Sequence, residues 1–212
     1  MTTAQVNALY IGLIGFLAIW GIVLVPQLAL QHVRFGRIVP RRIASTGALI
    51  AYASFAIAVT FFPVPGANGR RLEQTIQLVP FQWVADIQTE LHKHGLGAAH
   101  ALTTQTFQQL TLNVLLFVPL GVFARVLWKR GFTGTVLLGF CLSLAVEITQ
   151  LSANFGTAPF QYRIFDVDDL IANTTGAALG WIAAVLFLVL RSAVQPVREP
   201  ARSERVHLTE AR

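Results

Sequence analysis

Apolar residues occur along this chain in five long segments that are separated by polar loops. A segment of about 18 or more apolar residues is long enough to cross a hydrocarbon core roughly 30 Å thick. The pattern therefore predicts an all-α, polytopic bundle of five transmembrane helices. Their expected bounds are Ala8 to Leu30, Ile43 to Phe62, Thr106 to Val126, Phe132 to Leu151 and Leu170 to Leu190.

The loop between the second and third apolar segments, from Pro63 to Gln105, is long and has a pattern of its own. Apolar residues recur at helical spacing from Phe81 to Leu91, opposite acidic, amide and histidine side chains. This pattern predicts an amphipathic helix that lies in the membrane interface. Such a helix either covers the bundle as a lid or packs on it for stability, and the sequence favours neither role.

The composition agrees with a membrane protein. Hydrophobic residues make up 54% of the chain and charged residues 12%, whereas a soluble domain carries about 25% charged residues. The net charge of +6 does not indicate a nucleic-acid partner, because the basic residues are dispersed and lack interleaved aromatic residues. We expect these residues to contact anionic lipid head groups instead.

The distribution of basic residues also predicts the orientation of the helices. Lys and Arg are concentrated in the first and third inter-helix loops and after the fifth segment. Because basic residues in short loops remain in the cytoplasm, we expect a multi-pass plasma-membrane protein with its N-terminus outside and its C-terminus inside. Residues 1–195 are expected to form the membrane domain, and residues 196–212 a charged cytoplasmic tail.

Polar residues at the outer ends of the third, fourth and fifth segments are the candidate functional residues, because charge in a membrane is costly and usually functional. With a rise of 1.5 Å per residue, Asn113 lies about 10 Å below the outer end of its helix. The next helix brings Glu147 and Gln150 to a similar depth, and the fifth presents further polar residues on one face. The candidate pocket consists of Asn113, Glu147, Gln150, Arg163, Asp166, Asp169 and Asn173.

Proline and glycine residues in the same helices indicate close helix packing. Helix-perturbing residues are tolerated in a membrane where neighbouring helices satisfy the backbone. A pair of small residues four positions apart also lets another helix approach closely. The expected packing positions are Pro119, Gly121, Gly176 and Gly180.

Several of the polar residues also have structural explanations. Asp168 or Asp169 can cap the N-terminus of the fifth helix, and the amides of the candidate pocket can form inter-helix hydrogen bonds. A pair between Glu147 and Arg163 is the minimum explanation for two charges at this depth. Because the pocket holds three acids and one arginine, its excess negative charge fits a cation, a basic ligand or a protonated carboxyl group.

These residues together form an extended pattern, which comprises Leu78-Val79-Pro80-Phe81, Asn113xxxPhe117xPro119xGly121, Glu147xxGln150 and Arg163xxAsp166xxAsp169xxxAsn173xxGly176xxxGly180. The pattern covers about residues 50 to 190 and resembles the VanZ-like membrane family. The resemblance implies a small polytopic protein of the bacterial cell envelope. The family takes its name from low-level resistance to the glycopeptide teicoplanin, but membership does not imply that this chain itself confers resistance.

Two functional classes fit the pattern and the resemblance. In the first, the protein binds an outer-leaflet lipid, a lipid-linked cell-wall precursor or a glycopeptide, with a link to antibiotic resistance. The ligand would contact Arg163 directly or through a divalent cation held by Glu147, Asp166 and Asp169. In the alternative, these carboxylates supply acid/base or metal chemistry to an intramembrane enzyme acting on a lipid-linked substrate. The absence of an inverted repeat disfavours a transporter.

Overall fold

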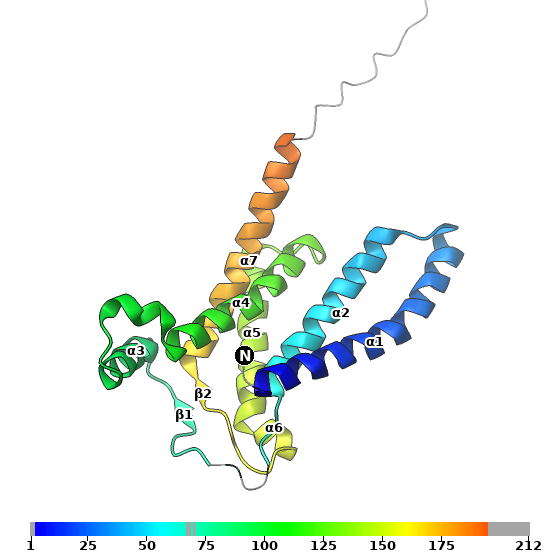
Figure 1. The fold of residues 1–212 in the computed structure, drawn as a ribbon. Coiled ribbons are helices and arrows are strands. Elements are labelled where there is room, and N and C mark those ends of the chain that lie inside the picture. Colours follow the sequence, from blue (N-terminus) through cyan, green and yellow to red (C-terminus); the bar gives the residue numbers. More distant parts are fainter. Residues whose placement is uncertain (1–2, 67–68, 70, 195–212) are drawn as a thin grey trace, which may run out of the picture.

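The computed structural model describes residues 3–66, 69 and 71–194, and the tail predicted for residues 196–212 lies outside them. Figure 1 shows how the elements are arranged. The long helices are α1 (Thr3–Phe35), α2 (Pro40–Phe61), α4 (Gln105–Val126), α5 (Phe132–Leu151) and α7 (Val167–Val194), and α3 (Gln82–Lys93) is a helix of intermediate length. The short elements are β1 (Ile76–Gln77), the 3-10 helix η1 (Ala98–Thr103), α6 (Ala153–Gly156) and β2 (Phe165–Asp166).

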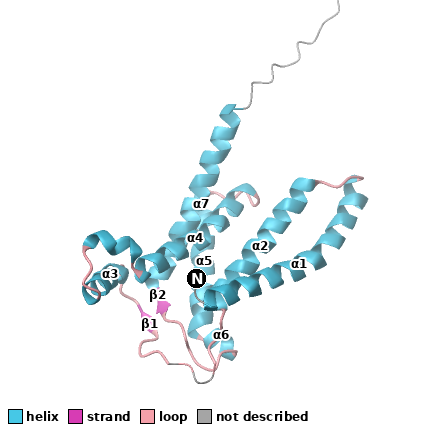
Figure 2. Ribbon diagram, viewed as in Figure 1, coloured by secondary structure: helices cyan, strands magenta, loops and turns pink. Residues whose placement is uncertain are grey.

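The predicted all-α fold is confirmed, because strands occur in the described residues only as the short β1 and β2 (Figure 2). Among the described residues, five helices are long and apolar enough to cross a membrane: α1, α2, α4, α5 and α7. Helices α1 and α7 extend furthest beyond the bounds that the apolar pattern indicated. Helix α1 continues to Phe35, and α7 begins at Val167, where acidic residues in its first turn favour a helix N-terminus.

The transmembrane helices form two groups, an α1–α2 hairpin and a bundle of α4, α5 and α7 (Figure 1). Helix α7 is central to the bundle, because it packs along α4 and also contacts α5. Phe117, Leu120 and Ala177 form the core, and Tyr52 of α2 packs against it. Apolar side chains such as Ile22 on α1 are exposed, as expected for helices whose outer surface faces lipid.

Glycines lie where α4 and α7 cross. At Gly121, Gly176 and Gly180, a side-chain methyl group would overlap a backbone carbonyl group of the facing helix. Helix α4 continues through Pro119. The two backbones therefore approach each other more closely than any larger residue would permit, in the manner of small-xxx-small helix pairs.

The helix predicted in the second loop is present as α3, and two carboxylates attach it to the bundle. At its start, Asp168 of α7 accepts hydrogen bonds from the backbone N–H groups of Phe81 (2.6 Å) and Trp83 (3.1 Å). Near its end, Glu90 accepts hydrogen bonds from the backbone N–H groups of Gln105 (2.7 Å) and Thr106 (3.2 Å) at the start of α4. Each carboxylate thus caps a helix other than its own.

The Glu90 contact is expected to weaken in acid. The backbone N–H groups of Gln105 and Thr106 favour the ionised carboxylate and lower the pKa of Glu90 below its ordinary value. A lowered folded-state pKa means that this stabilisation is fully present above the ordinary pKa of about 4.3. The stabilisation is lost as the pH falls through the lowered value.

Hydrogen exchange at the Gln105 and Thr106 amides, corrected for intrinsic rates, measures this contact. We expect Glu90→Gln to raise their exchange at neutral pH, while the wild type loses the same protection only in acid. Amides in the middle of α4 serve as the internal control. Equal protection of the two amides in the wild type and the variant at neutral pH would contradict the assigned cap.

Candidate functional site

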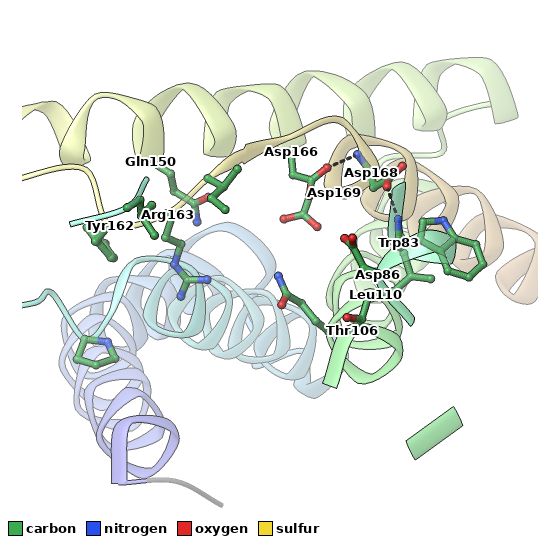
Figure 3. A pocket seen from close by; sticks show the side chains of 14 residues that line it. Trp83, Asp86, Thr106, Leu110, Gln150, Tyr162, Arg163, Asp166, Asp168 and Asp169 are labelled. Atoms are coloured by element: carbon green, nitrogen blue, oxygen red, sulfur yellow. Dashed lines mark hydrogen bonds between the residues drawn. The ribbon is translucent and has the colours of Figure 1, made fainter. Parts of the chain in front are cut away.

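A cavity of about 520 Å³ lies where α3 and the start of α4 meet the start of α7 and the segment before β2 (Figure 3). Pairing of β1 with β2 draws the second loop against this segment, with Gln77 opposite Asp166. Four of the seven predicted pocket residues line the cavity: Gln150, Arg163, Asp166 and Asp169. These four residues, which lie up to 19 positions apart in the sequence, therefore line one polar cavity.

The acidic residues at the start of α7 point in different directions. Asp166 caps the helix, since its side chain accepts a hydrogen bond from the backbone N–H of Asp168 at 2.8 Å. Neither Asp168 nor Asp169 is the N-cap that the sequence suggested, because α7 begins at Val167 and both residues lie in its first turn. Asp168 is 5% exposed and binds the start of α3, whereas Asp169 accepts a hydrogen bond from Asn113 of α4. Both residues line the cavity.

Glu147 and Arg163 do not form the expected pair. Glu147 is 1% exposed, and its carboxylate accepts a hydrogen bond from the backbone N–H of Asp166 at 3.1 Å. The Arg163 guanidinium donates instead to the carbonyl oxygen of Val59 in α2, at 3.4 Å. The backbone of β2 therefore supplies the hydrogen bond that the buried Glu147 carboxylate needs. The sequence had predicted Arg163 as its partner.

The remaining amides join helices. Gln150 donates to the carbonyl oxygen of Thr60 at 3.1 Å, which links α5 to α2 at the edge of the cavity. Asn173 is buried deeper and donates to the Ser143 hydroxyl oxygen at 2.9 Å, between α7 and α5. Asn173 thus lies apart from the cavity lining, in the position of an inter-helix hydrogen bond.

The sequence argument missed the contribution of α3 to the cavity. Trp83 and Asp86 both line it, and their spacing of three residues places them on one helix face. That spacing was visible in the sequence, but the amphipathic pattern alone assigned Asp86 to the solvent-facing side. Thr106 and Tyr162 also line the cavity, and no motif distinguished them.

The cavity holds charges of both signs on different sides. The carboxylates of Asp86, Asp166, Asp168 and Asp169 lie on one side, and Arg163 lies on the other (Figure 3). Burial raises the pKa of Asp166, and the nearby charges of Asp168 and Asp86 act in the same direction. These carboxylates make the cavity predominantly acidic.

The carboxylates considered as alternative ligands of a divalent cation, those of Glu147, Asp166 and Asp169, make separate contacts. In the part of the chain that the structure describes, no three His, Cys, Asp or Glu side chains are grouped as metal ligands. The reason is that Glu147 binds the backbone of β2 while Asp169 binds Asn113.

These features define a polytopic helical membrane protein with a polar cavity beside an amphipathic helix. A family model described as VanZ/LLP1 matches residues 49–189, a range that includes every residue of the cavity lining. The chain therefore belongs to the VanZ/LLP1 family.

The chain is also similar to "Protein VanZ" of Enterococcus faecium, with 31% identity over 90 residues. The match covers 42% of this chain and 52% of the relative, so the chain spans about half the length of that protein. No solved structure matches.

Proposed function

We propose that this protein binds the polar head group of a membrane-borne ligand in the cavity beside α3. The ligand is an outer-leaflet lipid, a lipid-linked cell-wall precursor or a glycopeptide. The observation that carries the proposal is the cavity itself, which is lined by Arg163 and by acidic residues from α3, β2 and α7. Placing charged groups within a membrane costs free energy, so such groups are usually paired with each other or take part in the function of the protein.

The size of the cavity supports a head group as the bound part. Small-molecule sites usually measure about 300–1,000 Å³, and this cavity measures about 520 Å³. A complete glycopeptide or lipid-linked precursor is larger than this volume. The rest of such a ligand would extend into the membrane or along the protein surface.

The distribution of charge along the bundle supports an outward-facing cavity. The cavity lies at the start of α4 and the end of α5, whereas the basic residues Lys129 and Arg130 lie between these helices at the opposite end. The basic loop between α1 and α2 occupies that same opposite end, because α2 finishes beside Arg163. Retention of basic loops in the cytoplasm then directs the cavity outward, as our orientation requires.

The proposal includes a link to antibiotic susceptibility, which is supported by membership of the VanZ/LLP1 family. A protein that occupies or shields a cell-wall precursor would act in proportion to its copy number, whereas an enzyme would act catalytically. Expression at graded levels in a teicoplanin-susceptible bacterium separates these behaviours. Formation of a product from a lipid-linked substrate by purified protein would favour the enzyme alternative.

Thermal unfolding with a panel of outer-leaflet lipids and a lipid-linked cell-wall precursor tests the binding proposal directly. A ligand present at 100 times its Kd is expected to stabilise the wild type by about 2.7 kcal/mol. Asp169→Asn should lose this stabilisation while retaining an acceptor for Asn113. The matched control is Glu204→Gln, which makes the same change in net charge in the tail outside the described residues. Failure of every panel member to stabilise the wild type would overturn the proposal.

A further inference from the structure

We propose that the head group bound in this cavity is a zwitterion with a primary ammonium and an anionic phosphate or carboxylate group. The ammonium is held by Asp86, Asp166 and Asp169, and the anionic group faces Arg163. This inference rests on the proposed function and specifies the chemistry of its ligand.

The cavity contains opposite charges that are not joined in an ion pair. Arg163 donates to the backbone of α2. Among the described residues, it forms no ion pair with the carboxylates that line the cavity. Asp169 is held by Asn113, and Asp166 by the first turn of α7. Because separate elements position these groups, the cavity keeps its positive and negative sides apart (Figure 3).

The acidic side suits an ammonium group better than a metal ion. A primary ammonium has three N–H donors. Four aspartates line this side of the cavity: Asp168 already accepts two backbone hydrogen bonds, and the other three can each accept one from the ammonium. A divalent cation needs several oxygens at about 2.0–2.6 Å, and no described group of acidic side chains is arranged as a metal site. A trimethylated ammonium has no donors and is usually held by several aromatic rings, whereas Trp83 and Tyr162 are the aromatic residues of this lining.

The opposite side suits an anionic group. A guanidinium binds phosphate or carboxylate oxygens through two parallel hydrogen bonds. Arg163 lines the cavity and donates a hydrogen bond to a backbone carbonyl oxygen rather than to a carboxylate. An ammonium and an anionic group in one small head group would contact both sides at once. The phosphoethanolamine head group of a phospholipid has this chemistry, as does a free zwitterion of the same kind.

Binding of phospholipids with identical short acyl chains tests the inference. Purified full-length protein is titrated with phosphatidylethanolamine, phosphatidylcholine, phosphatidylglycerol and free phosphoethanolamine, and binding is followed by native mass spectrometry. We expect phosphatidylethanolamine to bind at least about tenfold more tightly than phosphatidylcholine or phosphatidylglycerol, because hydrogen bonds between charged groups are lost in the latter two. Free phosphoethanolamine binding as tightly as the lipid would support the inference and identify a soluble ligand.

Variants locate the two ends of the ligand. Asp86→Asn and Arg163→Gln should each weaken phosphatidylethanolamine binding about tenfold, and Asp86→Asn should leave phosphatidylglycerol binding unchanged. The controls make the same charge changes: Arg37→Gln lies away from the cavity lining, and Glu204→Gln lies in the tail outside the described residues. Asp166→Asn retains a good helix cap and provides a second acidic-side variant if Asp86→Asn fails to fold.

Two different failures can be told apart. Equal binding of the three phospholipids, with no effect of the acidic-side variants, would overturn the zwitterion inference and leave a binding cavity in place. Binding of a precursor or glycopeptide that lacks an ammonium group would have the same meaning. The proposed function itself is overturned only when the wider panel described above fails to stabilise the wild type.

Discussion

Replacing Asp168 with alanine is expected to detach the start of α3 and to destabilise the protein by about 2–4 kcal/mol. Asp168 is 5% exposed and accepts hydrogen bonds from the backbone N–H groups of Phe81 and Trp83. Phe81 occupies the N-cap position of α3 but has no side-chain oxygen to satisfy these donors. Alanine would therefore leave two helix-terminal N–H groups without an acceptor.

Hydrogen exchange and limited proteolysis across residues 81–93, together with thermal unfolding, measure this effect. Asp168→Asn is the matched variant, because an amide oxygen can still accept one of the two hydrogen bonds, so a smaller loss is expected. Protection across α3 that stays at the wild-type level in Asp168→Ala would show that other contacts hold this helix. Since Trp83 and Asp86 line the cavity, ligand binding should weaken together with the protection.

The second large effect is expected from Gly176→Ala and Gly180→Ala at the crossing of α4 and α7. The added methyl group would overlap the carbonyl oxygen of Val114 or Val118, respectively. A backbone atom cannot rotate away as a flexible side chain can, so the helices must separate. Such overpacking costs about 1–3 kcal/mol for each substitution.

Unfolding of the purified variants in detergent, compared under identical conditions, tests the close approach of these helices. Gly21→Ala in α1 is the control, because no atom outside the neighbouring backbone of its own helix lies within 4 Å of the added methyl group. Alanine there is expected to be neutral or to stabilise the helix by up to about 1 kcal/mol. Stabilities of Gly176→Ala and Gly180→Ala equal to that of Gly21→Ala would contradict the tight crossing.

The Asp168 and glycine substitutions both act on α7. Helix α7 packs against α4 through its glycines and holds α3 through Asp168. It also carries Asp169 into the cavity. A change in the packing of α7 is therefore expected to alter the position of the acidic side of the cavity as well as the stability of the bundle.

The apolar pattern alone predicted the five long helices and the amphipathic α3, because each depends on the spacing of nearby residues. Helix length is set by the membrane thickness and an amphipathic face by the helical period, and both are local properties. The helix ends were less accurate. The first turn of α7 contains Asp168 and Asp169, which apolarity assigns to a loop although their charges favour a helix N-terminus.

The candidate site was predictable as a region but not as a set of contacts. Depth along a helix follows from residue number, and it grouped Gln150, Arg163, Asp166 and Asp169, which line one cavity. Depth does not determine which way a side chain points. For this reason Asn173 was included although it bonds to Ser143, and Asp86 was missed.

The sequence by itself determined the membrane class, the number of long helices, the presence of α3 and the level of the polar residues, since these follow from composition and periodicity along one chain. The tertiary structure decided which donor each carboxylate meets: Glu147 meets the backbone of β2, and Asp168 meets the start of α3. Hydrogen bonds depend on distances of about 3 Å between groups as many as 104 positions apart. Such distances are set only when the helices pack against one another.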